Sequence, residues 1–164
     1  MLHTAFIGLG SNLEDPRSQL QRAFADLDAL PDTRLVARSS LYRSAPVGYL
    51  DQPDFVNAVA QLETSIAPHD LLNSLLDIEH RHGRERTFRN APRTLDLDVL
   101  LYDELQLHEH GLTIPHPQMH LRAFVLQPLL ELAPDCAIPG VGSAAQALEG
   151  CADQSLERMQ DAAG

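Results

Sequence analysis

The sequence predicts an α+β fold, a ferredoxin-like sandwich with the element order β-α-β-β-α-β. Strand-like runs with a period of two are interleaved with two stretches whose apolar residues recur every three to four positions. This order predicts an antiparallel sheet with helices on one side, made three-layered by added C-terminal elements. With 164 residues and 44% hydrophobic content, the chain suits a single domain, residues 1–164, in which residues 140–164 are a peripheral segment.

The chain opens with a strand and a helix. Residues 4–9 are a short apolar run that predicts a strand. At its end, Gly8 and Gly10 are expected to form a tight strand-to-helix turn. A phosphate cradle is less favoured, because the rest of a dinucleotide or P-loop fingerprint is missing. Residues 15–16, Asp-Pro, then supply an N-cap and a proline at the first helical position. The apolar stripe of this helix is Leu20, Ala23, Phe24 and Leu27.

Two strands and a second helix follow. Residues 34–43 and 54–63 are strand-like, and residues 44–53 between them are too long for a tight hairpin, so they are a candidate functional loop. The second helix is expected to begin at Pro68 and to stop at Gly83. Its inward residues are predicted to be Leu71, Leu72, Leu75, Leu76 and Ile78.

The C-terminal third is less regular. Residues 112–115 form a short extended piece, and residues 120–132 a last core helix that is bent or ended at Pro128. Residues 140–164 are poorer in large apolar side chains, so a short peripheral helix or a frayed tail is expected there.

Asp96 and Asp98 are predicted to share one face of a strand, because Leu95, Leu97, Val99 and Leu101 alternate with them on the other face. At a rise of roughly 3.3 Å per residue, their Cα atoms lie about 6 to 7 Å apart. Both carboxylates can then ligate one Mg²⁺ or bridge two, and phosphate oxygens and water complete the octahedron. The simpler interpretation is an exposed strand face that carries two acids.

Arginines are concentrated just before this strand. The chain has 12 basic residues, all arginine, against 23 acidic ones, and five of the 12 lie within residues 81–93. Such a cluster in a chain of net charge -11 indicates a local anion, and the guanidinium fork suits phosphate oxygens. Solvated charge remains an alternative for Arg81 and Arg89 individually.

The composition of the chain limits which classes of protein it can belong to. No apolar run approaches the length of a membrane span, and no basic region precedes the N-terminal apolar stretch, so no membrane association and a cytoplasmic location are expected. The acidic balance argues against nucleic acid as a partner. Cys136 and Cys151 are expected to be reduced and structural. No long amphipathic stripe is left over, which favours a monomer.

Five motifs in one order carry a resemblance to a known family. They lie at residues 6–13 (Phe-Ile-Gly-Leu-Gly-Ser-Asn-Leu), 40–48 (Ser-Leu-Tyr-Arg-Ser-Ala-Pro-Val-Gly), 51–57 (Asp-Gln-Pro-Asp-Phe-Val-Asn), 93–98 (Arg-Thr-Leu-Asp-Leu-Asp) and 115–124, with Pro-His-Pro at its start and Arg-Ala-Phe at its end. Together they resemble 6-hydroxymethyl-7,8-dihydropterin pyrophosphokinases of folate biosynthesis. The match runs from about residue 4 to about residue 135.

The resemblance implies transfer of pyrophosphate from ATP to the pterin hydroxymethyl group, with release of AMP and with two Mg²⁺ ions held by Asp96 and Asp98. It implies catalytic roles for these two acids and for Arg84, Arg86 and Arg93. For ATP it implies contacts from Glu79, Arg84, Arg86, Arg93, His116 and Arg122. For the pterin it implies Ser44, Ala45, Val47, Phe55, Asn57 and Phe124. Without the motifs, Phe55 and Phe124 would be taken as core residues, and His116 as a turn histidine between two prolines.

This chain departs from the family pattern at three places. Residues 89–93 read Arg-Asn-Ala-Pro-Arg where members often carry Arg-Trp-Gly-Pro-Arg, so an indole is absent, and Phe88 replaces it only if the loop folds differently. Gly111 stands where an arginine is often found, and Pro117 replaces an aromatic hydroxyl residue. We therefore expect activity with altered kinetics.

Two other function classes remain open from the residues alone. A metal-dependent phosphohydrolase would use the same carboxylates to direct water, and it would release ADP or free pyrophosphate without a pterin. A non-catalytic ligand-binding module would hold a small anion without depending on magnesium.

Overall fold

The computed structural model of the chain describes residues 2–11, 16–44, 55–82 and 95–159. Their centre is an antiparallel sheet in the order β10-β3-β4-β1-β5, with β2 also paired to β4. Its strands are β1 (His3–Ser11), β2 (Thr33–Arg38), β3 (Tyr42–Ser44), β4 (Phe55–Thr64), β5 (Asp96–Tyr102) and β10 (Glu157–Arg158). The predicted ferredoxin-like order of elements is confirmed.

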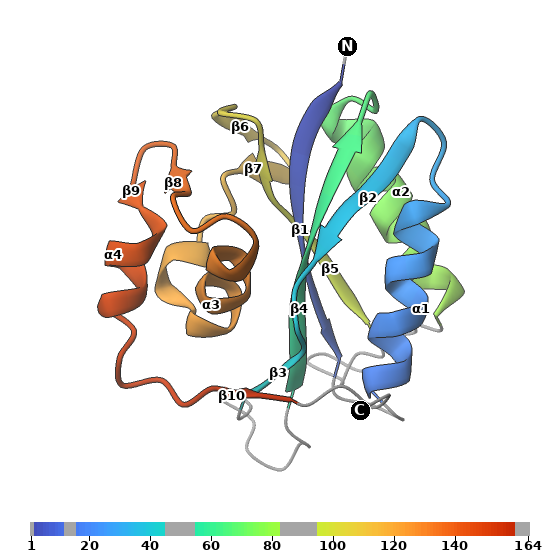
Figure 1. The fold of residues 1–164 in the computed structure, drawn as a ribbon. Helices are drawn as coiled ribbons and strands as arrows, with labels where there is room; N and C mark the ends of the chain where they lie inside the picture. Colours follow the sequence, from blue (N-terminus) through green and yellow to red (C-terminus); the bar gives the residue numbers. More distant parts are fainter. Residues whose placement is uncertain (1, 12–15, 45–54, 83–94, 160–164) are drawn as a thin grey trace.

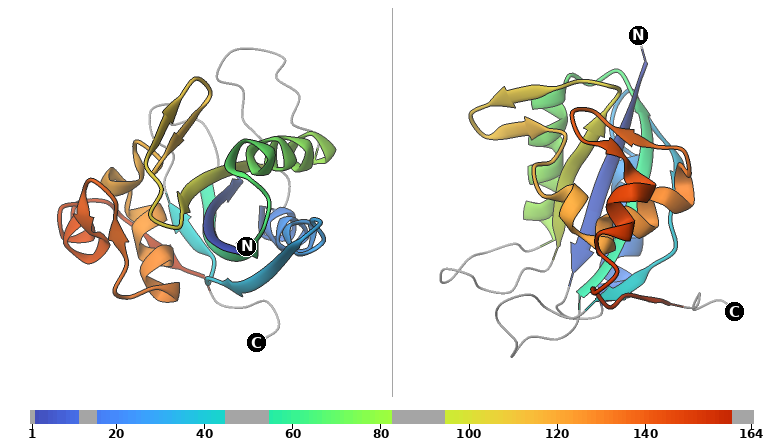
Figure 2. Two further views of the ribbon diagram at one scale, coloured as in Figure 1. Left: turned by 90° about the horizontal axis from the view of Figure 1, so that it is seen from above. Right: turned by 90° about the vertical axis from the view of Figure 1, so that its left-hand side faces the viewer.

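Helices cover both faces of this sheet. On one face lie α1 (Pro16–Asp28) and α2 (Pro68–Arg81), and on the other lie α3 (Ala123–Leu132) and the short α4 (Ala144–Glu149) (Figure 1). The view from above in Figure 2 shows the same three layers, with the sheet between the two pairs of helices. The predicted three-layer arrangement is therefore present.

Each face of the sheet has its own apolar core. Ile7, Leu62 and Leu97 belong to the core under α1 and α2, whereas Val59 and Leu100 belong to the core under α3 and α4. Because consecutive residues of a strand point to opposite faces, β4 and β5 are buried almost continuously rather than alternately.

Three expected features differ in the structure. The strand predicted over residues 34–43 is split into β2 and β3, which pair with successive parts of β4. Between them, the Ser40 backbone N–H donates to the Glu131 carboxylate at 2.9 Å, so this residue bonds to α3 instead of to the sheet. Leu76 was predicted to face inward but is 46% exposed, because it lies on the outer edge of the α2 stripe. The helix α3 continues through Pro128, whose ring is buried.

The C-terminal part is more ordered than a frayed tail. Two short hairpins, β6 (Leu107–Glu109) with β7 (Leu112–Ile114) and β8 (Ala137–Ile138) with β9 (Gly142–Ser143), flank the turn η1 (Met119–Leu121) and α3. Gly111 takes φ +85 in the first hairpin turn, a conformation that a side chain disfavours. The expected peripheral helix is α4, and β10 then joins the sheet.

Neither predicted cysteine role is contradicted: Cys136 and Cys151 are free thiols, and Cys151 is buried against the α3 core. Within the described ranges, no helix is both long enough and apolar enough to cross a membrane.

Candidate functional site

A cavity of about 620 Å³ opens on the α3 face of the sheet, where β1, β3, β4 and β5 come together beneath the start of α3. The structure brings eight predicted site residues together around it: Ser44, Phe55, Asn57, Asp96, Asp98, His116, Arg122 and Phe124. These residues are spread over eighty positions of sequence. The antiparallel register unites the five that lie on strands, and the segment leading into α3 adds His116, Arg122 and Phe124.

The floor of the cavity is made by the two N-terminal glycines. Gly8 and Gly10 lie within β1, so the predicted tight turn at these positions is wrong. A Cβ on Gly10 would come within 3.1 Å of the Asn57 Oδ1 atom, and one on Gly8 within 3.2 Å of Leu100. A side chain at Gly10 would therefore crowd the Asn57 amide, and one at Gly8 would crowd Leu100, so glycine at both positions keeps this part of the cavity open.

Asp96 and Asp98 both face the cavity, as their alternation predicted. Asp96 is half-buried and lies opposite Gly10, and Asp98 is exposed and lies opposite Gly8. The carboxylates are hard oxygen donors one strand pleat apart, which fits a magnesium ion that also takes phosphate oxygens. Among the described residues, no group of three His, Cys, Asp or Glu forms a complete protein cage for a metal. This donor set therefore suits a metal that arrives with a phosphate ligand.

Glu79 lies behind the acidic strand and is only 2% exposed. Its Oε2 atom accepts a hydrogen bond of 2.7 Å from the backbone N–H of Leu97, the residue between the two acids. Glu79 thus joins α2 to β5 and holds the part of the strand that carries Asp96 and Asp98. Its contact with ATP stays a prediction.

His116 lines the cavity between the acid pair and Arg122. Burial lowers its pKa, the Asp98 charge raises it, and the Arg122 charge lowers it, with a net fall. Its Nδ1 atom accepts a hydrogen bond of 3.1 Å from the Gln118 backbone N–H. The neutral ring therefore carries its proton on Nε2, and it offers a hydrogen-bond donor rather than a cation.

Asn57 is buried on β4, and its orientation is set by Ser44. The Asn57 Nδ2 atom donates to Ser44 Oγ at 2.8 Å, which leaves the second amide proton and Oδ1 to other partners. Phe55 and Phe124 are both half-buried at the cavity, so they are not simply core residues. The Arg122 guanidinium lies 5.6 Å from the centre of the Phe124 ring.

Five predicted site residues lie outside the described part of the chain: Ala45, Val47, Arg84, Arg86 and Arg93. The same holds for Phe88 and for the whole departure at residues 89–93.

Sequence reasoning missed the other lining residues, among them the polar Gln118 and Gln154 and the exposed Leu121. Gln118 and Leu121 lie inside the last recognised motif but between its diagnostic positions. No local pattern marks Gln154, because only the return of the C-terminal segment to the sheet brings it to the cavity.

Comparisons with known proteins point to one family. The family model "7,8-dihydro-6-hydroxymethylpterin-pyrophosphokinase (HPPK)" matches residues 6–134. A 2-amino-4-hydroxy-6-hydroxymethyldihydropteridine pyrophosphokinase of Pseudomonas aeruginosa is 48% identical over 162 residues, which cover 99% of this chain and 100% of that protein. The protein of the same name from Haemophilus influenzae is 45% identical, with 95% of this chain and 98% of that protein covered.

Solved structures share the fold at low sequence identity. An HPPK-DHPS in complex with substrates matches with a TM-score of 0.73 at 11% identity, and it covers 92% of this chain but 43% of that chain. An HPPK-DHPS of Plasmodium falciparum matches with a TM-score of 0.71 at 13% identity and covers 92% of this chain and 44% of that one. The chain thus spans less than half of these longer proteins.

Proposed function

Because the chain belongs to the 7,8-dihydro-6-hydroxymethylpterin-pyrophosphokinase family, we propose that the cavity beside α3 is where it transfers pyrophosphate from ATP to that pterin. The products are the pterin diphosphate, used in folate biosynthesis, and AMP. One observation gives the strongest support for this location of the site. Asn57, Gly10 and Asp96 lie side by side on three neighbouring strands, so a pterin-binding amide and a metal-binding carboxylate face one cavity across a glycine.

Asp96 and Asp98 are proposed to hold two magnesium ions. When bound, these ions would neutralise charge on the phosphates around the bond that breaks. Glu79 supports this role from behind, because its hydrogen bond to Leu97 fixes the strand between the two ligands.

The pterin is proposed to lie against Asn57. The hydrogen bond to Ser44 fixes the amide plane, so Asn57 offers a donor and an acceptor in one plane to a planar heterocycle. Phe55 and Phe124 supply apolar ring faces at the same cavity. Ala45 and Val47 are proposed for the rim.

The phosphates of ATP are proposed to lie between the acid pair and Arg122. Arg122 supplies a permanent positive charge there. In the ligand-free protein, burial and the Arg122 charge hold the pKa of His116 below its ordinary value, and with Nδ1 accepting from Gln118 the Nε2 atom is proposed to donate to a phosphate oxygen. Arg84, Arg86 and Arg93 are proposed to complete the phosphate site, and Glu79 stays a proposed ATP-side residue. Exclusion of water by these groups would favour transfer to the pterin over hydrolysis.

The remaining expectations are also proposals: a single domain over residues 1–164, a monomer, a cytoplasmic location and no nucleic-acid partner. The net charge of -11 supports the last of these.

The test is the product formed from Mg-ATP with and without the reduced pterin. We expect AMP only when the pterin is present, and loss of turnover when EDTA removes the metal. Asp96→Asn and Asp98→Asn should each lower kcat at least about a hundredfold, since each removes a charged metal ligand. Asp135→Asn, at an exposed position beyond the far end of α3, is the matched control and should leave kcat unchanged.

ADP as the product, or AMP formed equally without pterin, would reject the reaction. Turnover by both acid variants at the wild-type rate would reject the metal assignment while leaving the reaction standing.

A further inference from the structure

The C-terminal segment from Cys151 to Met159, here called the strap, follows α4 and contributes Gln154 to the lining of the cavity. It lies beyond residues 6–134, which match the family model. Figure 1 shows it running from α4 beneath α3 to the edge of the sheet, where β10 pairs with β3. The strap is therefore close to both walls of the cavity.

On the α3 side, Gln154 holds the backbone around Arg122. Its Nε2 atom donates to the Leu121 carbonyl at 2.8 Å, and its Oε1 atom accepts from the Ala123 backbone N–H at 2.9 Å. Ala123 is the first residue of α3, so its N–H has no acceptor within the helix. One amide side chain thus bonds to the residues before and after Arg122.

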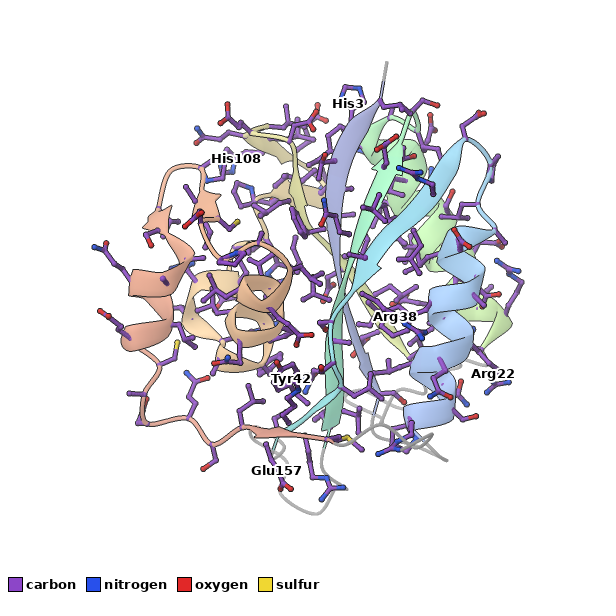
Figure 3. All side chains as sticks on the ribbon, viewed as in Figure 1. His3, Arg22, Arg38, Tyr42, His108 and Glu157 are labelled. Atoms are coloured by element: carbon purple, nitrogen blue, oxygen red, sulfur yellow. The ribbon has the colours of Figure 1, made fainter. Side chains whose placement is uncertain are left out.

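On the other side, the strap extends the sheet. Glu157 and Arg158 pair with Arg43 and Tyr42, and the Met159 N–H donates to the Leu41 carbonyl at 2.8 Å. Figure 3 shows Tyr42 and Glu157 close together at this end of the sheet. The paired strand β3 ends in Ser44, which orients Asn57.

We propose that Gln154 is a positioning residue for pyrophosphoryl transfer, which holds Arg122 and Phe124 at the substrates while the rest of the strap holds β3. The proposal rests on the function proposed above, because Arg122 and Phe124 matter only if they contact substrate. Their backbone has no capping side chain of its own, since the N-cap of α3 is Arg122 with no side-chain cap bond. Without Gln154, the start of α3 loses the bonds that keep both side chains at the cavity.

The test is a double-mutant cycle between Gln154→Leu and Arg122→Ala, read as kcat/KM for Mg-ATP with saturating pterin. We expect Gln154→Leu to lower kcat/KM about tenfold, because misplacement of a binding group by a fraction of an ångström costs this much. The loss in the double variant should be smaller than the product of the two single losses, since part of the effect of Gln154 passes through Arg122. A purely structural role would instead give losses that multiply.

Gln146→Leu, at an exposed glutamine on α4, is the matched control and should behave as wild type. Gln154→Glu is the second variant if Gln154→Leu does not fold. It keeps the acceptor for Ala123 but loses the donor to Leu121, so it should also slow the reaction and give the same non-additivity with Arg122→Ala.

Four results are informative. Kinetics of Gln154→Leu and Gln154→Glu equal to Gln146→Leu, or losses that multiply fully with Arg122→Ala, would overturn the positioning role alone. If Arg122→Ala has wild-type kinetics, the positioning role of Gln154 would also be overturned, because Arg122 would then contribute nothing to the reaction. Absence of pterin-dependent AMP from the wild-type protein would instead overturn the proposed function, and this inference with it.

Discussion

At the scale of single residues, several residues of this protein matter for the neighbouring group that they hold in place. Ser44 orients the Asn57 amide, and Glu79 accepts from the backbone between the two acids. Gly10 contributes by lacking a side chain, because a Cβ there would press on Asn57. A search for ligand-binding or catalytic side chains does not single out such residues for this role, although each helps to position a side chain of the site.

Tyr42 gives a residue-scale prediction about alkaline pH. Burial, a hydrogen bond to Glu131 and the Glu131 charge together raise the pKa of Tyr42 to about 12, while Arg158 opposes them. Because the folded-state pKa is raised above the ordinary value of 10.0, the contribution to stability is complete below pH 10 and is lost towards pH 12.

The measurement is urea unfolding of wild type and Tyr42→Phe across this pH range. The difference in unfolding free energy between them should shrink by about 1 to 2 kcal/mol, a value reduced for solvent screening of the exposed Glu131. The remaining tyrosines are present in both proteins and cancel. Parallel pH profiles for the two proteins would contradict the prediction.

At the scale of elements, α1 and α2 pack against the sheet through narrow apolar stripes. In α2, Leu71, Leu75 and Ile78 are fully buried, while Leu76 is 46% exposed. Apolar residues that recur every three to four positions share one face of a helix. Two adjacent leucines cannot both lie at the centre of that face, because successive residues are rotated by about 100° around the helix axis. This is why the prediction that Leu76 faces inward was wrong.

Leu75→Ala and Leu76→Ala form a matched pair on one helix. Leu75→Ala should lower the free energy of unfolding by about 2 to 5 kcal/mol, since it leaves a cavity in the core. Leu76→Ala should change it by no more than about 0.5 kcal/mol. Chemical denaturation measures both, and equal losses would show that the α2 stripe is broader than the structure has it.

At the scale of the whole molecule, one sheet separates two apolar cores. The strands β4 and β5 contribute side chains to both, so neither core can form without the sheet that the other also stabilises. We therefore expect a single cooperative unfolding transition, as the proposed single domain requires.

Native-state hydrogen exchange tests this coupling. Leu126→Ala, in the core under α3, should lower the protection of the slowest amides of α2 as much as that of α3, although the two helices lie on opposite faces. The free energy of opening for the slowest amides should fall by about 2 to 5 kcal/mol in both α2 and α3. Leu75→Ala should have the reciprocal effect. A loss confined to the mutated side would instead indicate two independently opening units.

The local chemistry and the order of elements could be predicted from the amino-acid sequence. The period of two from residue 95 to 101 placed Asp96 and Asp98 on one face, and spaced motifs named the family, because both depend on neighbours along the chain. The split of the second strand and the continuation of β1 through its two glycines were not predicted from the sequence.

Which distant residues come into contact follows from the packing of the whole chain. Antiparallel register set Asn57, Gly10 and Asp96 in one row, and the return of the strap brought Gln154 to Ala123 across 31 positions of sequence. Such contacts arise from packing two cores on one sheet, and no local periodicity records which strand will lie beside which. The acid pair could therefore be predicted from the sequence, and the cavity that it serves could not.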